Sequence, residues 1–238
     1  MNLKQSKGNF FKDTDGNVIL DLNCAQPLGY NHDALINARD SNIYDRFLQG
    51  TVDVSSLPPQ DFTDILADDV MPAAPQGLNQ VHLADGSSSA ANELALSSCI
   101  MQYAMKNNKS NYSDLSVMGF SKAAHGCTVA TLSCSDAGIN IGNVPTYDWP
   151  VSDLPKVVLP FALNEQANMA EEERCLESAR QTIAQRRAAG KDVAAIIVEP
   201  ISSLEMRNAT PSFYKGLRHL AKQEGIPFIV DETKSGMG

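Results

Sequence analysis

The chain has 238 residues and a net charge of −9 at pH 7, from 19 Lys and Arg against 28 Asp and Glu. This length suits one large domain, or one domain with part of another, and 43% hydrophobic with 20% charged residues excludes a mainly disordered chain. The acidic balance argues against nucleic acid as a partner, which needs a basic face, and no apolar run approaches the roughly 20 residues of a membrane span.

The cysteines predict a reduced, intracellular protein. Their number is odd and no C-x-x-C pair occurs, so we expect neither a disulfide framework nor a metal site. The cysteines are Cys24, Cys99, Cys127, Cys134 and Cys175. Residues 1–7 are too short and polar for a signal or transit peptide. Because import removes a presequence, this observation leaves the compartment open.

The first elements expected are a hairpin and a helix. Residues 8–12 and 18–22 are strand-like and flank Asp15-Gly16, whose glycine tolerates the positive φ of a tight turn. Residues 62–70 carry apolar side chains at helical spacing, which predicts a helix with one buried face.

From residue 80 onward the chain alternates between strand and helix patterns. Strands are expected at 81–83, 115–120, 156–159, 193–198 and 227–230, and helices at 91–105, 126–132, 165–189 and 211–223. This alternation predicts an α/β fold with a parallel sheet. The apolar runs at 193–198 and 227–230 predict buried strands, and the charged stretch 171–174 predicts a solvated helix face.

A run of small residues follows the first of these expected strands and leads into a helix. Gly86 and Ser87 begin this run, where small side chains let N–H groups and hydroxyls approach an anion at the helix N-terminus. The run has neither a Walker lysine nor G-x-G-x-x-G spacing. Composition alone therefore favours an ordinary serine N-cap.

Acidic residues end two of the expected strands. Glu199 follows one, and Asp231 with Glu232 follows another. Ligands of open parallel sheets bind at the carboxyl ends of the strands, where a carboxylate can hold a cationic ring nitrogen or a metal. One such acid is more often a cap or an ion-pair partner, but two in one sheet favour a site. His125 also follows a strand, and alone it favours a hydrogen-bonded structural role.

Several motifs occur in a fixed order along nearly the whole chain. They are Gly8-Asn9-Phe10-Phe11, Leu28-Gly29-Tyr30-Asn31-His32, Leu57-Pro58-Pro59, His125-Gly126, Tyr147-Asp148-Trp149-Pro150, Ile197-Val198-Glu199-Pro200-Ile201 and Val230-Asp231-Glu232. In this order they resemble class III pyridoxal-phosphate-dependent aminotransferases, on the branch of the eukaryotic 4-aminobutyrate aminotransferases.

The resemblance implies an α/β fold, the large domain of a fold-type-I pyridoxal-phosphate transferase, with a mostly parallel sheet and flanking helices. Residues 61–238 would form part of this domain, after an N-terminal segment, residues 1–60, that carries the hairpin. The domain would be incomplete at both ends, because the family's first stretch, the rest of the large domain and the small domain have no counterpart in these 238 residues. The resemblance also favours the mitochondrial matrix.

The resemblance assigns roles at the cofactor to individual positions. The family's Gly-Ser pair, which cradles the cofactor phosphate, matches Gly86-Ser87, or Ser88-Ser89 in a second alignment. The family's strand-tip aspartate pairs with the pyridinium nitrogen and matches Asp231. That charge pair keeps the ring an electron sink.

Two further matches stand beside two departures. His125 matches the family's histidine at the cofactor, and Glu199 matches its glutamate near the substrate pocket. Ala124 replaces the aromatic residue that stacks on the ring in the family, and Cys127 replaces the arginine that binds the substrate carboxylate. A thiol cannot replace a bidentate guanidinium clamp. We therefore expect vestigial binding residues and no catalytic residue in this chain.

The remaining departures lie further along the chain. Lys234 replaces a glutamine that contacts the cofactor hydroxyl, and Ser203-Leu204-Glu205-Met206 fills a stretch that is rich in glycine in the family. The lysine that binds the cofactor covalently in the family would lie beyond Gly238. No covalently bound cofactor is therefore expected, and whether the protein is an enzyme stays uncertain.

Three hypotheses follow from these matches and departures. The favoured one is a catalytically inactive aminotransferase-like protein, a pseudoenzyme kept as a structural or interaction subunit of a larger assembly. The alternative is part of a functional pyridoxal-phosphate-dependent 4-aminobutyrate transaminase, as a split or truncated chain. The third is a module that binds the cofactor noncovalently. We expect other protein subunits or a homodimer mate to cover the open strand edge near residues 226–238, because uncovered edges aggregate.

Overall fold

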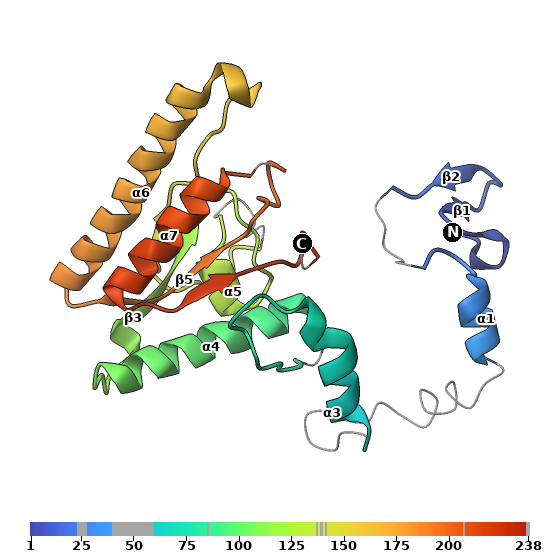
Figure 1. Cartoon of the computed structure of the whole chain (residues 1–238), viewed down its shortest axis with the longest axis horizontal. Helices are drawn as coiled ribbons and strands as arrows, with labels where there is room; N and C mark the ends of the chain where they lie inside the picture. The colour runs from blue at the N-terminus through green and yellow to red at the C-terminus, as the bar shows by residue number, and fades with distance from the viewer. Residues whose placement is uncertain are drawn as a thin grey trace. The chain divides into compact units, whose positions relative to one another are not determined.

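The computed structural model describes residues 1–22, 28–39, 60–84, 86–136, 138, 140, 142–206 and 208–236 (Figure 1). The chain divides into two compact units, Met1–Val70 and Met71–Gly238. Cys24, the Leu57-Pro58-Pro59 motif and the last two residues lie outside the described residues.

The predicted hairpin is confirmed in the first unit. Strand β1 (Phe10–Lys12) pairs antiparallel with β2 (Val18–Leu20). The turn between them is held by Asp13, whose Oδ1 accepts hydrogen bonds from the backbone N–H groups of Asp15 and Asn17 at 2.9 and 2.8 Å. Gly16 has a φ of +92°, as the Asp15-Gly16 pair predicted for this turn.

Two short helices follow in the first unit. Helix α1 spans Asp33–Arg39, and α3 spans Phe62–Ile65 and continues as a π-type turn over Leu66–Val70. A helix is therefore present where the spacing predicted one, but none of its residues is fully buried and Ile65 is 45% exposed. Apolar spacing indicates which face can be buried, but it does not supply the surface that covers it.

The second unit is a parallel sheet with helices on both faces. Its strands are β3 (Leu115–Phe120), β4 (Val151–Ser152), β5 (Asp192–Val198) and β6 (Phe228–Val230), in the order β4-β3-β5-β6. Its helices are α4 (Ser88–Lys106), α5 (Val129–Ser133), α6 (Glu165–Ala188) and α7 (Pro211–Glu224). Short 3₁₀ turns lie at Leu3–Gln5, Met71–Ala73, Tyr112–Asp114 and Phe161–Leu163. The predicted α/β fold with a parallel sheet is confirmed.

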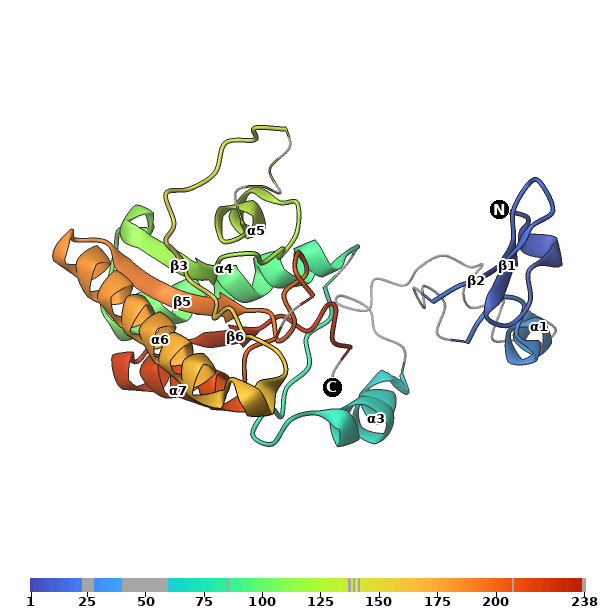
Figure 2. The same cartoon turned by 90° about the horizontal axis from the view of Figure 1, so that it is seen from above.

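Alternate residues of β3 and β5 pack on opposite faces of this sheet. Val117 and Ile197 pack with Leu96 of α4, whereas Met118 and Ile196 join the larger core under α6 and α7. Figure 2 shows the strands between the α4–α5 layer and the α6–α7 layer. All residues of β5 are buried, as its continuous apolar run predicted.

Two predicted strands are wrong. Residues 156–159 are irregular, because the Asn168 side chain takes the place of a partner strand. Its amide donates to the Val158 carbonyl at 3.0 Å and accepts from the Val158 N–H at 2.8 Å. Residues 81–83 are also irregular, and Leu83 is 41% exposed. A segment of three residues makes too few ladder bonds to form a strand without a neighbour.

Strand β6 forms where predicted, but it is not buried as predicted. It pairs with β5 and lies at the edge of the four-stranded sheet in the part of the chain that the structure describes. Val230 is 47% exposed, and Phe228 and Ile229 are half-buried. Strand β6 has an apolar sequence like that of β5, but its side chains are less completely covered than those of the central β5.

The prediction of a solvated face at 171–174 is wrong for Glu172, which is 5% exposed. Its carboxylate accepts hydrogen bonds from the backbone N–H and the hydroxyl of Thr210 at 2.8 and 2.7 Å. Thr210 is the N-cap of α7 and accepts from the Phe213 N–H. Glu172 therefore joins α6 to the beginning of α7, while Arg174 is exposed as expected.

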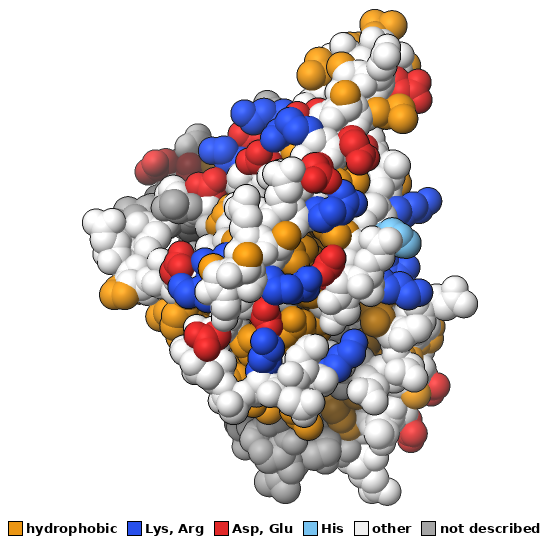
Figure 3. Space-filling model, turned by 90° about the vertical axis from the view of Figure 1, so that its left-hand side faces the viewer, with side chains coloured by type: hydrophobic (Ala, Val, Ile, Leu, Met, Phe, Trp, Pro, Cys, Tyr) orange, Lys and Arg blue, Asp and Glu red, His pale blue; other side chains and the backbone are white. Residues whose placement is uncertain are grey.

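Charged side chains of both signs are interspersed on the face drawn in Figure 3, with hydrophobic side chains between them. Basic residues of α6 pair with acids, as Arg187 does with Glu224 at 2.8 Å. Among the described helices, none is long and apolar enough to cross a membrane. The described residues also contain no cluster of His, Cys, Asp and Glu that could hold a metal ion.

Candidate functional site

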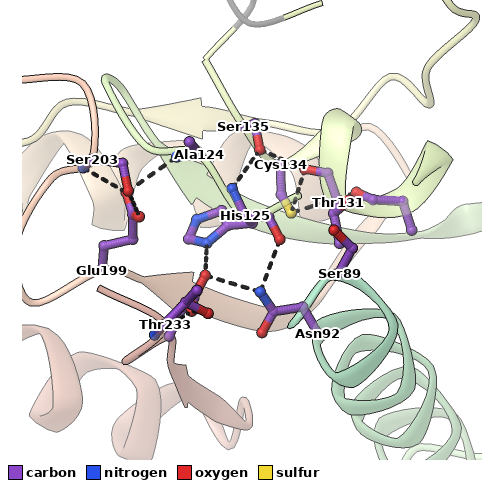
Figure 4. A network of polar contacts seen from close by, with 12 residues as sticks. Ser89, Asn92, Ala124, His125, Thr131, Cys134, Ser135, Glu199, Ser203 and Thr233 are labelled. Atoms are coloured by element: carbon purple, nitrogen blue, oxygen red, sulfur yellow. Dashed lines mark hydrogen bonds and ion pairs between the residues drawn. The ribbon is translucent and has the colours of Figure 1, made fainter. Parts of the chain in front are cut away.

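Asp231 follows the carboxyl end of β6 and is 4% exposed. Its Oδ2 accepts hydrogen bonds from His125 Nδ1 at 2.8 Å and Asn92 Nδ2 at 2.9 Å. Its Oδ1 accepts from the backbone N–H of Thr233 at 3.1 Å and from the Thr233 hydroxyl at 2.6 Å. Figure 4 shows these partners converging from separate elements. A carboxylate offers about four lone-pair positions, so the chain itself fills them.

These contacts keep the Asp231 carboxyl ionised. Burial raises its pKa, but the hydrogen bonds from His125 and Thr233 outweigh burial and lower the pKa from 3.8 to about 2. Because a carboxylate can only accept, Nδ1 of His125 carries the hydrogen in this contact. The site therefore holds a buried negative charge, which suits a cationic ring nitrogen.

His125 lies in a loop that is fixed on both sides. Its backbone N–H donates to Ser135 Oγ at 2.9 Å, and its carbonyl accepts from Asn92 Nδ2 at 2.8 Å. Nε2 of His125 is buried and has no hydrogen-bond partner among the described residues. A buried polar atom without a partner costs about 1–3 kcal/mol and is uncommon in a finished core. This atom marks the neighbourhood of Asp231 as a candidate site.

The N-terminus of α4 packs against the same loop. Ser87 is the N-cap, and its hydroxyl accepts from the backbone N–H three residues on at 3.3 Å, so the predicted serine N-cap is confirmed. Gly86 has a φ of +97°, which glycine adopts without strain. Ser89 Oγ accepts from the Cys127 N–H at 3.3 Å, and a Cβ on Gly126 would lie 2.5 Å from that oxygen. Glycine at 126 therefore allows this close approach.

Glu199 follows β5 and is 3% exposed. Its Oε2 accepts from the backbone N–H groups of Ala124 and Ser203, both at 3.1 Å. Its Oε1 accepts from the Ser203 hydroxyl. Glu199 therefore joins the loop of His125 to the turn after β5, and its carboxylate faces its own chain. This contact gives the acid a structural role.

The residues predicted from the sequence lie near the carboxyl ends of the strands. His125 contacts Asp231 directly, and Glu199 binds the residue before His125. Gly86 and Ser87 precede α4, the helix whose second turn reaches Asp231 through an amide. The strand expected before Gly86 is absent, so the helix N-terminus alone provides the anion-binding geometry there.

Sequence reasoning missed two residues of the site. Asn92 stands inside α4, and its amide bridges the His125 carbonyl and Asp231. Thr233 holds Oδ1 of Asp231 from two residues further on. The order Asp-x-Thr is a signal for a local turn of this type, whereas the Asn92 contact joins distant positions and has no local signal.

Comparison with known proteins identifies the family. The family model Aminotransferase class-III matches residues 1–238. The chain belongs to this family. It is 36% identical to 4-aminobutyrate aminotransferase of Dictyostelium discoideum, over 98% of this chain and 51% of that protein. It is 33% identical to the human mitochondrial 4-aminobutyrate aminotransferase, over 100% and 52%. The chain spans about half the length of the curated relatives it matches.

Solved structures agree with this family and confirm the fold class. Lysine aminotransferase from M. tuberculosis matches with a TM-score of 0.78 and 25% identity, over 99% of this chain and 55% of that one. An amine transaminase from an uncultivated Pseudomonas species has a TM-score of 0.74 at 20% identity, over 97% and 51%. At that identity the second match bears on the fold alone.

The family uses pyridoxal phosphate, and the described residues fit this cofactor only in part. Gly86, Ser87 and Ser88 are exposed at the start of a 19-residue helix, and the accepting role of the Ser87 hydroxyl leaves its hydrogen free for a phosphate oxygen. Where the cofactor's ring would lie, the negative charge of Asp231 suits the ring nitrogen, but the hydrogen-bonding positions of the carboxylate are occupied. Asp231 has no vacant acceptor position while Thr233 donates to Oδ1.

Proposed function

We propose that this chain is an aminotransferase-like protein that does not transaminate 4-aminobutyrate and acts as a structural or interaction subunit of a larger assembly. One observation carries the proposal: the carboxylate of Asp231 is already satisfied by hydrogen bonds from three residues of its own chain. When bound to an aminotransferase, pyridoxal phosphate supplies an electron sink, and a strand-tip carboxylate maintains it by holding the ring nitrogen protonated. A carboxylate engaged by its own chain performs this task poorly.

The substrate side supports the same proposal. Cys127, at the position where the family resemblance places a carboxylate-binding arginine, is exposed and has no positively charged form. Ala124, at the position of the ring-stacking residue, is small, and its backbone N–H is bound to Glu199. Glu199 itself is occupied by Ser203. The polar groups of Ala124, Glu199 and Ser203 are thus bound to one another and not directed to a substrate.

One feature favours the alternative, a part of a working transaminase. The buried pair of His125 and Asp231 persists with a 2.8 Å contact and an Asp231 pKa of about 2, which is the charge that a pyridinium needs. A protein with no remaining use for the cofactor has no need of that buried charge. Under this alternative, other polypeptide would complete the substrate side.

The interaction role rests on the edge of the sheet. Val230 of β6 is 47% exposed, although it belongs to an apolar strand that pairs with β5. Exposed strand edges offer unpaired N–H and C=O groups to another chain, so a second subunit or a homodimer mate is the proposed cover. The mouse and human relatives are mitochondrial by name, and we propose the same compartment for this protein.

The test is a coupled assay of succinic semialdehyde, with 4-aminobutyrate, a 2-oxo acid and excess pyridoxal phosphate. The full protein is expected to show no turnover above a no-protein control, and the human relative serves as the positive control. Turnover by the protein alone would overturn the proposal. Turnover only after addition of a second polypeptide from the same source would favour the alternative. Native mass measurement of the purified protein tests the interaction role, and a stable monomer without a partner would contradict it.

A further inference from the structure

The partners of Asp231 differ in how freely they can move. Asn92 and His125 are 8% and 2% exposed and are held by further contacts, since the Asn92 amide also binds the His125 carbonyl. Thr233 is exposed, and its hydroxyl donates to Oδ1 at 2.6 Å. The hydroxyl can leave Oδ1 by rotation about one side-chain bond, and solvent can then satisfy it. Oδ1 of the buried carboxylate is thus held by the partner that moves most easily.

Because a carboxylate accepts only a limited number of hydrogen bonds, the Thr233 hydroxyl competes with a ligand for Asp231. Each carboxylate oxygen has two lone pairs, and both oxygens here accept two hydrogen bonds. A protonated pyridine nitrogen can bind Asp231 only where one donor withdraws. Withdrawal of Asn92 or His125 would leave a buried polar group unpaired, which is costly. Withdrawal of the Thr233 hydroxyl leaves no buried group without a partner.

From this asymmetry we infer that the Thr233 hydroxyl is a gate on Asp231, which weakens binding of a phosphorylated pyridine by occupying the oxygen that the ring nitrogen needs. The inference rests on the proposed function, because it takes the site of Asp231 and the α4 N-terminus as a reduced pyridoxal-phosphate site. It adds the residue that determines how well the site binds. The backbone N–H of Thr233 stays on Oδ1 in either state, so the gate is the hydroxyl alone.

The experiment compares the affinity of matched variants for pyridoxamine 5′-phosphate. This probe has the ring and the phosphate but no aldehyde, so it cannot condense with surface lysines. Titration calorimetry of the protein uses the wild type, Thr233→Val, Thr233→Ser, Asp231→Asn and the double variant Thr233→Val with Asp231→Asn, which is compared with Asp231→Asn. Valine keeps the shape of threonine without the hydroxyl, and serine keeps the hydroxyl. The exposed position makes both replacements compatible with folding, which circular dichroism verifies.

Thr233→Val is expected to bind the probe about tenfold more tightly than the wild type, the order of effect of one hydrogen bond to a charged group. Thr233→Ser should bind like the wild type, and the gain should vanish in the double variant. Equal affinities of the wild type and Thr233→Val would overturn the inference. A gain that survives Asp231→Asn would also overturn it, because valine would then act by apolar contact. Wild-type turnover in the coupled assay would instead refute the proposed function and leave these affinities as they are.

Discussion

Replacement of Asp231 by asparagine tests whether the site is also a source of stability. The amide has one accepting oxygen, whereas the carboxylate uses both oxygens to accept from His125, Asn92 and Thr233. In Asp231→Asn the NH₂ group must face at least one N–H donor, and the buried charge that these donors stabilise is lost. The variant is therefore expected to unfold more easily at neutral pH.

The pKa of Asp231 gives the magnitude and the direction of the pH dependence. A folded-state pKa of about 2 against 3.8 corresponds to roughly 2.5 kcal/mol of unfolding free energy. Because the folded-state pKa is lowered, this stabilisation is complete above about pH 5 and is lost as the pH falls toward 2. About 1 kcal/mol is lost by pH 3. The difference in stability between wild type and Asp231→Asn should therefore shrink on acidification.

Urea unfolding at pH 7, 5, 4 and 3, followed by circular dichroism, measures this difference. Asp148→Asn is the control, because Asp148 binds Arg186 and Lys191 but its side chain is 77% exposed, and exposed ion pairs contribute little. A wild-type minus Asp231→Asn difference that stays constant from pH 7 to pH 3 would refute the reasoning, since it would show that Asp231 has an ordinary pKa in the folded chain. A difference below about 0.5 kcal/mol at pH 7 would refute it as well.

Two further changes test the frame around the site. Glu172→Ala should destabilise the second unit by about 2 kcal/mol, because it leaves the Thr210 N–H at the start of α7 unpaired. Glu172→Gln should cost less stability. A loss of stability in Glu172→Ala no greater than that in the exposed Glu173→Ala would contradict the role assigned to Glu172. Gly119→Ala should cost about 3 kcal/mol by urea unfolding, since its Cβ would lie 1.9 Å from the Cys134 carbonyl oxygen. Gly142→Ala, with its nearest contact at 3.7 Å, is the control, and equal losses in both would show that position 119 can relax.

Elements with local start and stop signals could be predicted from the sequence. Helix α7 begins after Thr210, whose hydroxyl caps it, with Pro211 in its first turn, and it ends at Gly225 with a φ of +66°. The prediction of 211–223 missed its end by one residue. The hairpin turn behaved in the same way, because Asp13 holds it through neighbours in the sequence.

Elements that depend on distant partners could not be predicted. Residues 156–159 have the composition of a strand, but the Asn168 amide pairs with the backbone of Val158, and no propensity encodes that contact. Glu172 looks like any acid of a charged helix until α7 packs against it. In both cases a polar side chain satisfies backbone groups that regular structure would otherwise have paired.

The candidate site likewise contains residues that could be predicted from the sequence and contacts that could not. Asp231 and Glu199 could be singled out because acids after two strands of one parallel sheet must come together at its carboxyl edge. Their state could not be predicted, because it depends on which donors reach them. Asn92 reaches Asp231 across 139 positions of sequence. Acids at strand ends therefore locate a site, but they do not tell whether their oxygens are available to a ligand.

The property that determines what this site can bind is whether the oxygens of its buried acid are free to accept from a ligand. A buried carboxylate is costly unless it is paired, so a chain that keeps Asp231 must either bind a cation there or supply donors of its own. Here His125 and Asn92 come from the buried frame and Thr233 from the exposed side. The first two offset the cost of the charge in the folded chain, and the third is the donor that, on the inference above, competes with a ligand. On that inference, removal of the Thr233 hydroxyl should free an acceptor position on Oδ1 of Asp231 and tighten the binding of a protonated ring nitrogen, without changing the two donors that stabilise the buried charge.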